Sequence, residues 1–107
     1  MGTDKNTNSQ SASSVMEKTK QKVNEPTLFN VVFHNDDYTT MEFVVYVLRE
    51  VFNKTGKEAQ ELMLAVHETG KGIAGTYVKE IADLKRAKVI ELACKEDAPL
   101  TVTVEAN

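Results

Sequence analysis

The sequence has one cysteine, no excess of basic residues and no long apolar run, and each shortage excludes a class of protein. Cys94 alone can form no internal disulfide, which is typical of a reducing compartment, and it is too little for a zinc-binding ligase domain. The formal net charge is -3 and the lysines and arginines do not cluster, so nucleic acid is not an expected partner. No window approaches the roughly 18 apolar residues of a membrane span, and residues 1–25 lack the apolar run of a signal peptide. We therefore expect a cytoplasmic protein without a membrane partner.

Motifs for catalysis are also scarce. The sequence contains no H-E-x-x-H, no C-x-x-C and no nucleophile elbow, and Gly70-Lys71-Gly72 lacks the flanking residues of a phosphate loop. We expect no enzymatic activity and no cofactor. The less favoured alternative is a small metal-dependent hydrolase, which bound metal in the purified protein would support, with the candidate residues His34, Asp36, Asp37 and His67.

The chain divides at Pro26 into a polar leader and a packed domain. Residues 1–25 are rich in Ser, Thr, Asn, Gln and Lys, with little apolar surface to bury, and are predicted to be a flexible extension. Residues 26–107 are predicted to form a single domain, near the size at which a core alone gives marginal stability.

The domain is predicted to be α+β, in the order strand, helix, helix, strand, helix, strand. The strands are expected where β-branched and aromatic residues concentrate or alternate with polar ones, at 28–34, 72–78 and 100–105. Helical periodicity is expected from about residue 40 to 52, 57 to 69 and 79 to 94. A three-stranded antiparallel sheet packed against three helices is the simplest arrangement that buries every apolar face.

The first two helices have recognisable ends and apolar faces. Thr39 and Glu42 have capping-box spacing, which predicts an N-cap at Thr39, and Gly70 is placed to act as the C-cap of the second helix. The predicted apolar face of the first helix is Met41, Val44, Val45, Leu48 and Phe52, and that of the second is Ala59, Leu62, Met63 and Val66.

The third helix carries a lysine within its apolar face. At 100° per residue, an arc of roughly 120° contains Ile81, Ala82, Val89, Leu92 and Ala93. Lys85 falls inside the same arc. Such a lysine must either extend its ammonium to water or find an acceptor, which marks Lys85 as a candidate contact point.

The segment that follows the first strand has two interpretations. Asn35, Asp36 and Asp37 are typical of a turn between a strand and a helix, and local chemistry alone favours that interpretation. The alternative is a site, because Asn35 and Asp36 would place polar acceptors beside the apolar start of the next helix. His67 also shares a helix face with two apolar residues, Met63 and Val66.

Several runs together resemble the ClpS family of protease adaptors. They are Asn35 to Thr39, Met41 to Val44, Leu62 to His67, Gly70 to Gly72 and Pro99-Leu100, and the resemblance extends from about Leu28 to the C-terminus. It implies a protein that binds another protein's first residue and delivers it to an ATP-driven protease. It implies that the α-amino group is held by Asn35, Asp36 and His67. The side chain of the bound protein's first residue would occupy a pocket lined by Asp37, Thr39, Met41, Val44, Met63, Val66 and Leu100.

The resemblance also implies ligands, a partner and a location. The ligands would be N-degron proteins or peptides that begin with Leu, Phe, Tyr or Trp. The location would be the bacterial cytoplasm. The partner would be the N-terminal domain of a ClpA- or ClpC-type unfoldase, contacted by Glu80 and Lys85, and the unfoldase would also engage the leader. The chain departs from the family pattern at His34, Thr40 and Cys94, and His34 would alter the pocket if it faced it. A protein-interaction scaffold of the same fold without an amine pocket is the other alternative.

Overall fold

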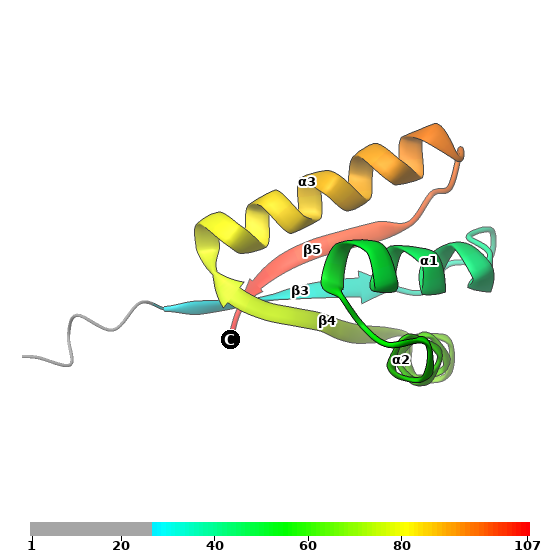
Figure 1. The fold of residues 1–107 in the computed structure, drawn as a ribbon, viewed down its shortest axis with the longest axis horizontal. Helices are drawn as coiled ribbons and strands as arrows, with labels where there is room; N and C mark the ends of the chain where they lie inside the picture. The colour runs from blue at the N-terminus through cyan, green and yellow to red at the C-terminus, as the bar shows by residue number, and fades with distance from the viewer. Residues whose placement is uncertain (1–26) are drawn as a thin grey trace, which may run out of the picture.

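An antiparallel sheet of three strands, in the order β4-β3-β5, is the centre of the fold (Figure 1). The computed structural model describes residues 27–107, so the predictions for the leader and for Pro26 lie outside the described residues. The elements, in chain order, are β3 (Leu28–His34), α1 (Met41–Phe52), α2 (Gly56–Thr69), β4 (Lys71–Val78), α3 (Lys79–Lys95) and β5 (Thr101–Ala106). The predicted α+β class, strand order along the chain and antiparallel pairing are confirmed.

The central strand β3 is the most deeply buried part of the sheet. It pairs with β4 on one side and β5 on the other, so Val31 lies opposite both Gly75 and Val104. Val31, Val32 and Phe33 are at most 3% exposed. Such burial is typical of a β-branched and aromatic run, and the strand predicted from that run has the correct bounds.

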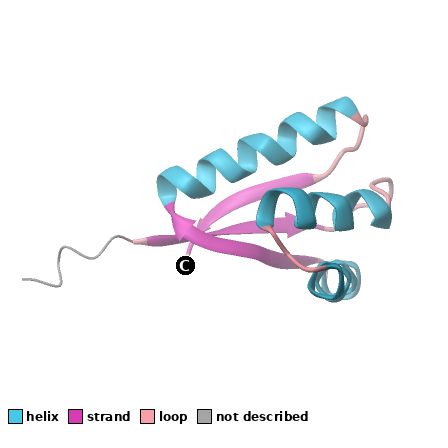
Figure 2. Ribbon diagram, in the orientation of Figure 1, coloured by secondary structure: helices cyan, strands magenta, loops and turns pink. Residues whose placement is uncertain are grey.

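Each helix packs against a different part of this sheet. Helix α3 contacts all three strands and α1, while α2 packs against α1 and β4. The loop from β3 to α1 and the helix α2 lie at one end of the sheet, and the C-terminus lies at the other (Figure 2). Within residues 27–107, no helix is long and apolar enough to cross a membrane.

The start of α1 differs from the prediction by one residue. Its N-cap is Thr40, whose hydroxyl accepts a hydrogen bond from the Phe43 amide at 3.1 Å. The predicted cap at Thr39 is wrong because the Thr39 hydroxyl instead donates to Asp36. A true capping box occurs at α2, where Thr55 and Glu58 exchange hydrogen bonds, and the predicted Gly70 C-cap is confirmed with a φ of 98°.

The buried faces of α1 and α3 differ in part from the predicted ones. Helix α1 buries Val47 and Val51, which the periodicity did not select, because it packs against α2, α3 and β4 at once. Met41 is 44% exposed, since it lies outside the buried core and lines hollows at the surface. In α3, Ala82, Val89 and Ala93 are buried as predicted, whereas Ile81 is 39% exposed. The buried faces are Val44, Val47, Leu48, Val51 and Phe52 in α1, and Ala82, Val89 and Ala93 in α3.

Lys85 has found an acceptor inside the fold. Its ammonium donates to the carbonyl of Val51 at 2.7 Å and lies 5.6 Å from the centre of the Tyr77 ring. Carbonyls in the last turn of a helix lack a partner within the helix, so this bond satisfies one of them and ties α3 to the end of α1.

Gly72 lets β4 approach α2 closely. A Cβ at this position would lie 2.8 Å from Val66 Cγ2 and 3.1 Å from Leu62 Cδ1. We expect Gly72→Ala to lower the free energy of unfolding by about 1–3 kcal/mol, as overpacking of a core does. Urea denaturation measures this change.

Gly56→Ala is the matched control for Gly72→Ala. A Cβ at Gly56 meets nothing within 4 Å, and Gly56 is the first residue of α2. Alanine there should be neutral or stabilise the protein by up to about 1 kcal/mol. Equal stability of the two variants would contradict the close approach of β4 to α2.

Candidate functional site

The loop between β3 and α1 is organised around the Asp36 carboxylate. Its Oδ1 accepts hydrogen bonds from the backbone amides of Tyr38 at 2.8 Å and Thr39 at 2.7 Å. Its Oδ2 accepts from the Thr39 hydroxyl at 2.7 Å. The amide of Asn35 donates to the carbonyl of Gly70 at 2.9 Å, which joins the loop to the end of α2. An aspartate that bonds the backbone ahead of it is the usual way to fix such a turn, so the turn interpretation of the sequence holds.

The same hydrogen bonds keep Asp36 charged. Partial burial raises the pKa of the Asp36 carboxyl, but the hydrogen bonds from the Thr39 amide, the Thr39 hydroxyl and the Tyr38 amide together lower it by more. The pKa of Asp36 therefore lies below its ordinary value, and the loop presents a fixed negative charge at neutral pH.

A cavity of about 230 Å³ opens beside this loop. Its walls come from the loop, from the first turn of α1 and from the last turns of α2. Pockets for drug-sized ligands span about 300–1,000 Å³, so this volume is appropriate for a single side chain. The lining consists of Asn35, Asp36, Asp37, Thr39, Met41, Val44, Met63, Val66 and His67.

The cavity has an apolar floor and a polar rim. Val44 and Val66 are buried, at 8% and 5% exposure, and form the deep part of the lining. Asn35, Asp37 and His67 are exposed and lie at the surface. The structure thus brings together polar acceptors and apolar side chains from two segments that are distant in sequence, residues 35–44 and residues 63–67.

All but one of the residues predicted for amine and side-chain binding line this cavity, and the lining contains no residue that was not predicted. Leu100 is the exception, because it is half-buried against the hydrophobic core and is not part of the lining. Its role in the pocket stays a prediction. Glu80 and Lys85 lie on α3, outside the cavity.

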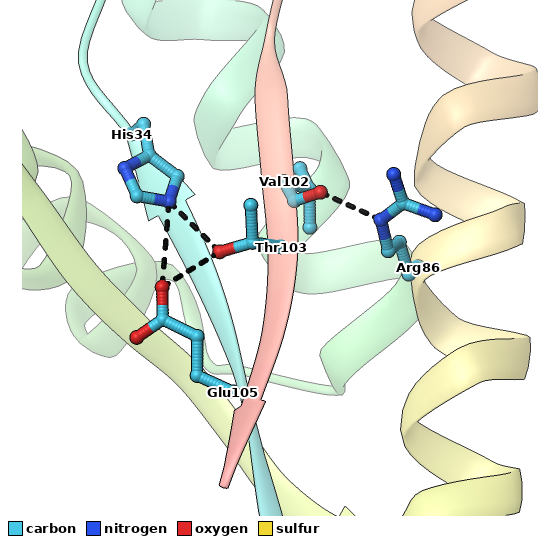
Figure 3. A network of polar contacts seen from close by, with 5 residues as sticks. All are labelled: His34, Arg86, Val102, Thr103 and Glu105. Atoms are coloured by element: carbon cyan, nitrogen blue, oxygen red, sulfur yellow. Dashed lines mark hydrogen bonds and ion pairs between the residues drawn. The ribbon is translucent and has the colours of Figure 1, made fainter.

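His34 lies on the sheet and not in the cavity. Its Nε2 is 2.8 Å from Thr103 Oγ1 and 3.9 Å from Glu105 Oε2, and the Thr103 hydroxyl donates to Glu105 at 2.9 Å (Figure 3). On the opposite side of β5, Arg86 Nε donates to the Val102 carbonyl at 2.7 Å. The His34 side chain therefore does not line the cavity with the other three residues considered for a metal-dependent hydrolase. Among residues 27–107, no group of three or more His, Cys, Asp or Glu side chains is arranged to hold a metal ion.

These features place the chain in the class of small α+β domains with a side-chain-sized surface cavity. The family model for the ATP-dependent Clp protease adaptor protein ClpS matches residues 24–103. The chain belongs to the ClpS family.

Individual relatives agree with this assignment. The ATP-dependent Clp protease adapter protein ClpS of Caulobacter vibrioides is 47% identical over 95 residues, which cover 89% of this chain and 87% of that protein. The ClpS of Nitratidesulfovibrio vulgaris is 52% identical over 86 residues, covering 80% of this chain and 86% of that protein. The solved structure of Agrobacterium tumefaciens ClpS2 bound to L-phenylalaninamide matches with a TM-score of 0.75 and 31% identity, over 78% of this chain and 100% of that one.

Proposed function

We propose that the protein is a non-catalytic adaptor that binds the first residue of an N-degron substrate and delivers the substrate to a Clp-type ATP-dependent unfoldase. The observation that carries this proposal is the cavity, in which a ring of polar acceptors borders an apolar floor. The ClpS2 structure supports it, because L-phenylalaninamide consists of a free α-amino group and a benzyl side chain on an amide. Delivery would take place in the bacterial cytoplasm.

The rim matches a protonated α-amino group. Such a group carries a positive charge and three donors, and needs acceptors arranged around one point. The Asn35 side-chain oxygen, the Asp36 carboxylate and the His67 imidazole would supply them. Asp36 already accepts three hydrogen bonds from its own loop. A carboxylate has about four lone-pair sites, so one acceptor site is left for the amine, together with the charge.

The floor matches a large apolar side chain that is not branched at Cβ. Val44 and Val66 form it, and Met41 and Met63 also line the cavity. Burial of a Leu or Phe side chain contributes about 1.5–3 kcal/mol, more than a single exposed ion pair would give, and the hydrogen bonds to the charged amine add a comparable amount. Affinity should thus depend on both the apolar side chain and the free terminus. We expect Leu, Phe, Tyr and Trp to bind at the first position.

Met41 would exclude β-branched first residues. It lines the cavity and is 44% exposed, so part of its side chain is at the protein surface. We expect Met41→Ala to raise the affinity for peptides that begin with Ile or Val by about tenfold, since about 1.4 kcal/mol of steric conflict would be removed. Fluorescence anisotropy over a series of first residues measures this, and the same series tests the proposed ligand range.

Leu64→Ala is the matched control for Met41→Ala. Leu64 is 46% exposed on α2, like Met41 on α1, but it does not line the cavity. The control should leave the preference for the first residue unchanged. If Ile and Val peptides bind the Met41→Ala protein no better than the wild type, Met41 does not guard the pocket.

The partner in delivery would be the N-terminal domain of a ClpA- or ClpC-type unfoldase. The proposed contacts, Glu80 and Lys85, lie on α3, whereas the cavity is built from α1, α2 and the loop before α1. Substrate and unfoldase could therefore be bound at the same time. A protein-interaction scaffold without an amine pocket would show no dependence on the free terminus.

A further inference from the structure

The Tyr77 ring lies where β4, α1 and α3 meet. Tyr77 is the next to last residue of β4, and α3 begins two residues later at Lys79 (Figure 1). Its half-buried ring has its centre 6.4 Å from that of Phe52, the last residue of α1. The Lys85 ammonium on α3 lies over the same ring, 5.6 Å from its centre. One aromatic ring from the sheet therefore contacts the lysine that is proposed to bind the unfoldase.

Gly75 determines where this ring can lie. A Cβ at Gly75 would be 2.6 Å from Tyr77 Cε2 and 2.7 Å from Tyr77 Cζ, and the nearest atom would be Tyr77 Oη. The ring thus lies against the backbone of Gly75, in space that a Cβ would occupy. Its partial burial raises the pKa of the Tyr77 hydroxyl and limits the access of water to the ring. Cation–π attraction is stronger where water is excluded, so the Tyr77 ring is a suitable partner for an ammonium.

Two groups together hold the Lys85 ammonium. The Val51 carbonyl accepts one of its three donors at 2.7 Å, and the Tyr77 ring attracts its charge. Lys85 also lines a hollow of about 420 Å³ between the end of α1 and the first half of α3. A partner that enters this hollow could reach the two donors that remain. The Lys85 side chain is thus held in one conformation before any partner binds.

We infer that Tyr77 is a positioning residue for the unfoldase contact, because its ring holds Lys85 in the conformation that meets the N-terminal domain. This inference rests on the proposed function, in which Lys85 is one of the contacts. A lysine has a flexible four-carbon stem, and immobilising such a side chain during binding lowers the affinity. Lys85 is immobilised when the domain folds instead. Loss of the ring should therefore lower the affinity for the N-terminal domain by about three- to tenfold.

The test compares Tyr77→Leu, which removes the ring, with Tyr77→Phe, which keeps it. Isothermal titration calorimetry measures the affinity for the isolated N-terminal domain of the unfoldase. Tyr77→Leu should bind about three- to tenfold more weakly than the wild type. Tyr77→Phe should bind within about twofold of the wild type, because the face of the ring and not the hydroxyl attracts the ammonium. Both variants should bind a Phe-initiated peptide as tightly as the wild type, since Tyr77 does not line the cavity.

A double-mutant cycle with Lys85→Met separates positioning from a merely structural role. Methionine keeps an unbranched side chain but has no charge, so it leaves no ammonium for the ring to hold. In the Lys85→Met background, Tyr77→Leu should have no further effect on the affinity for the N-terminal domain. An equal loss in both backgrounds would mean that Tyr77 acts on the interface without Lys85, and the inference would be wrong.

Gly75→Ala tests the same inference without changing the ring itself. The added Cβ would displace the Tyr77 ring, so this variant should lose affinity for the N-terminal domain by a similar factor, and again only when Lys85 is present. Gly56→Ala is the control, because a Cβ there meets nothing within 4 Å, and it should leave the affinity unchanged.

The outcomes distinguish this inference from the proposed function. If Lys85→Met binds the N-terminal domain as tightly as the wild type, Lys85 is not a contact, and that part of the proposed function fails together with the inference. If Lys85→Met weakens binding but Tyr77→Leu and Gly75→Ala do not, the Lys85 contact stands and Tyr77 does not position it.

Discussion

Asp36→Ala protein is expected to bind a peptide that begins with a free Phe at least about 100-fold more weakly than the wild type, a loss of about 2.7 kcal/mol. Two effects add. The substitution removes the negative charge proposed to face the α-amino group, and a hydrogen bond to a charged group is worth about 1.5–3 kcal/mol. It also frees the Tyr38 and Thr39 groups that Asp36 holds, so the loop would lose its turn. Isothermal titration calorimetry measures the loss.

Asp36→Asn separates the charge from the turn. An asparagine oxygen can still accept from the amides of Tyr38 and Thr39, but it carries no charge. We expect this variant to keep the fold and still bind weakly. Asp83→Ala is the control, since it removes an exposed carboxylate that pairs with Lys79 on α3, far from the proposed amine contacts in sequence. Unchanged affinity in both Asp36 variants would favour a scaffold without an amine pocket.

Delivery is expected to fail in the double variant Glu80→Ala and Lys85→Ala. As hot spots of the interface, the two residues together should contribute about 2 kcal/mol or more, so the affinity for the unfoldase N-terminal domain should fall by about 30-fold or more. Binding of a Phe-initiated peptide should be unaffected, because neither residue lines the cavity. The measurements are the affinity for the isolated domain and the rate at which a Phe-initiated substrate is degraded.

Lys85 needs its own control because it also has a structural role. Its ammonium donates to the Val51 carbonyl, which leaves two of its three donors for a partner. Glu80→Ala alone should weaken binding to the unfoldase domain while leaving the hydrogen bond from Lys85 to the Val51 carbonyl intact. Lys88→Ala removes a neighbouring exposed lysine of α3 and should leave delivery intact. Normal delivery by the double variant would place the unfoldase contact elsewhere.

The sequence predicted the elements well where one pattern dominated. The bounds of the first strand are correct because a continuous β-branched and aromatic run has no other good interpretation. The start of α1 was misplaced because Thr39 and Thr40 stand side by side and either can cap a helix. The spacing could not show that Asp36 would engage the Thr39 hydroxyl and leave the cap to Thr40.

Tertiary packing determines which residues are buried and how some side chains are oriented, and local sequence patterns do not contain this information. Val47 and Val51 of α1 are buried because three elements surround that helix, whereas periodicity alone selects a narrower face. The orientation of the His34 side chain depends on Thr103 and Glu105, which lie about 70 residues away along the chain, so no local rule predicts it. The residues of the site were indicated by resemblance, and the structure shows how the loop and two helices bring most of them to one cavity.

The most direct test of the account compares one peptide, beginning with Phe, in its free and its N-acetylated form. Acetylation removes the positive charge and two of the three donors while leaving the Phe side chain intact, so the account predicts a loss of affinity of at least about 100-fold. Equal affinity for the two forms would contradict the claim that the rim of this cavity recognises the start of a polypeptide chain.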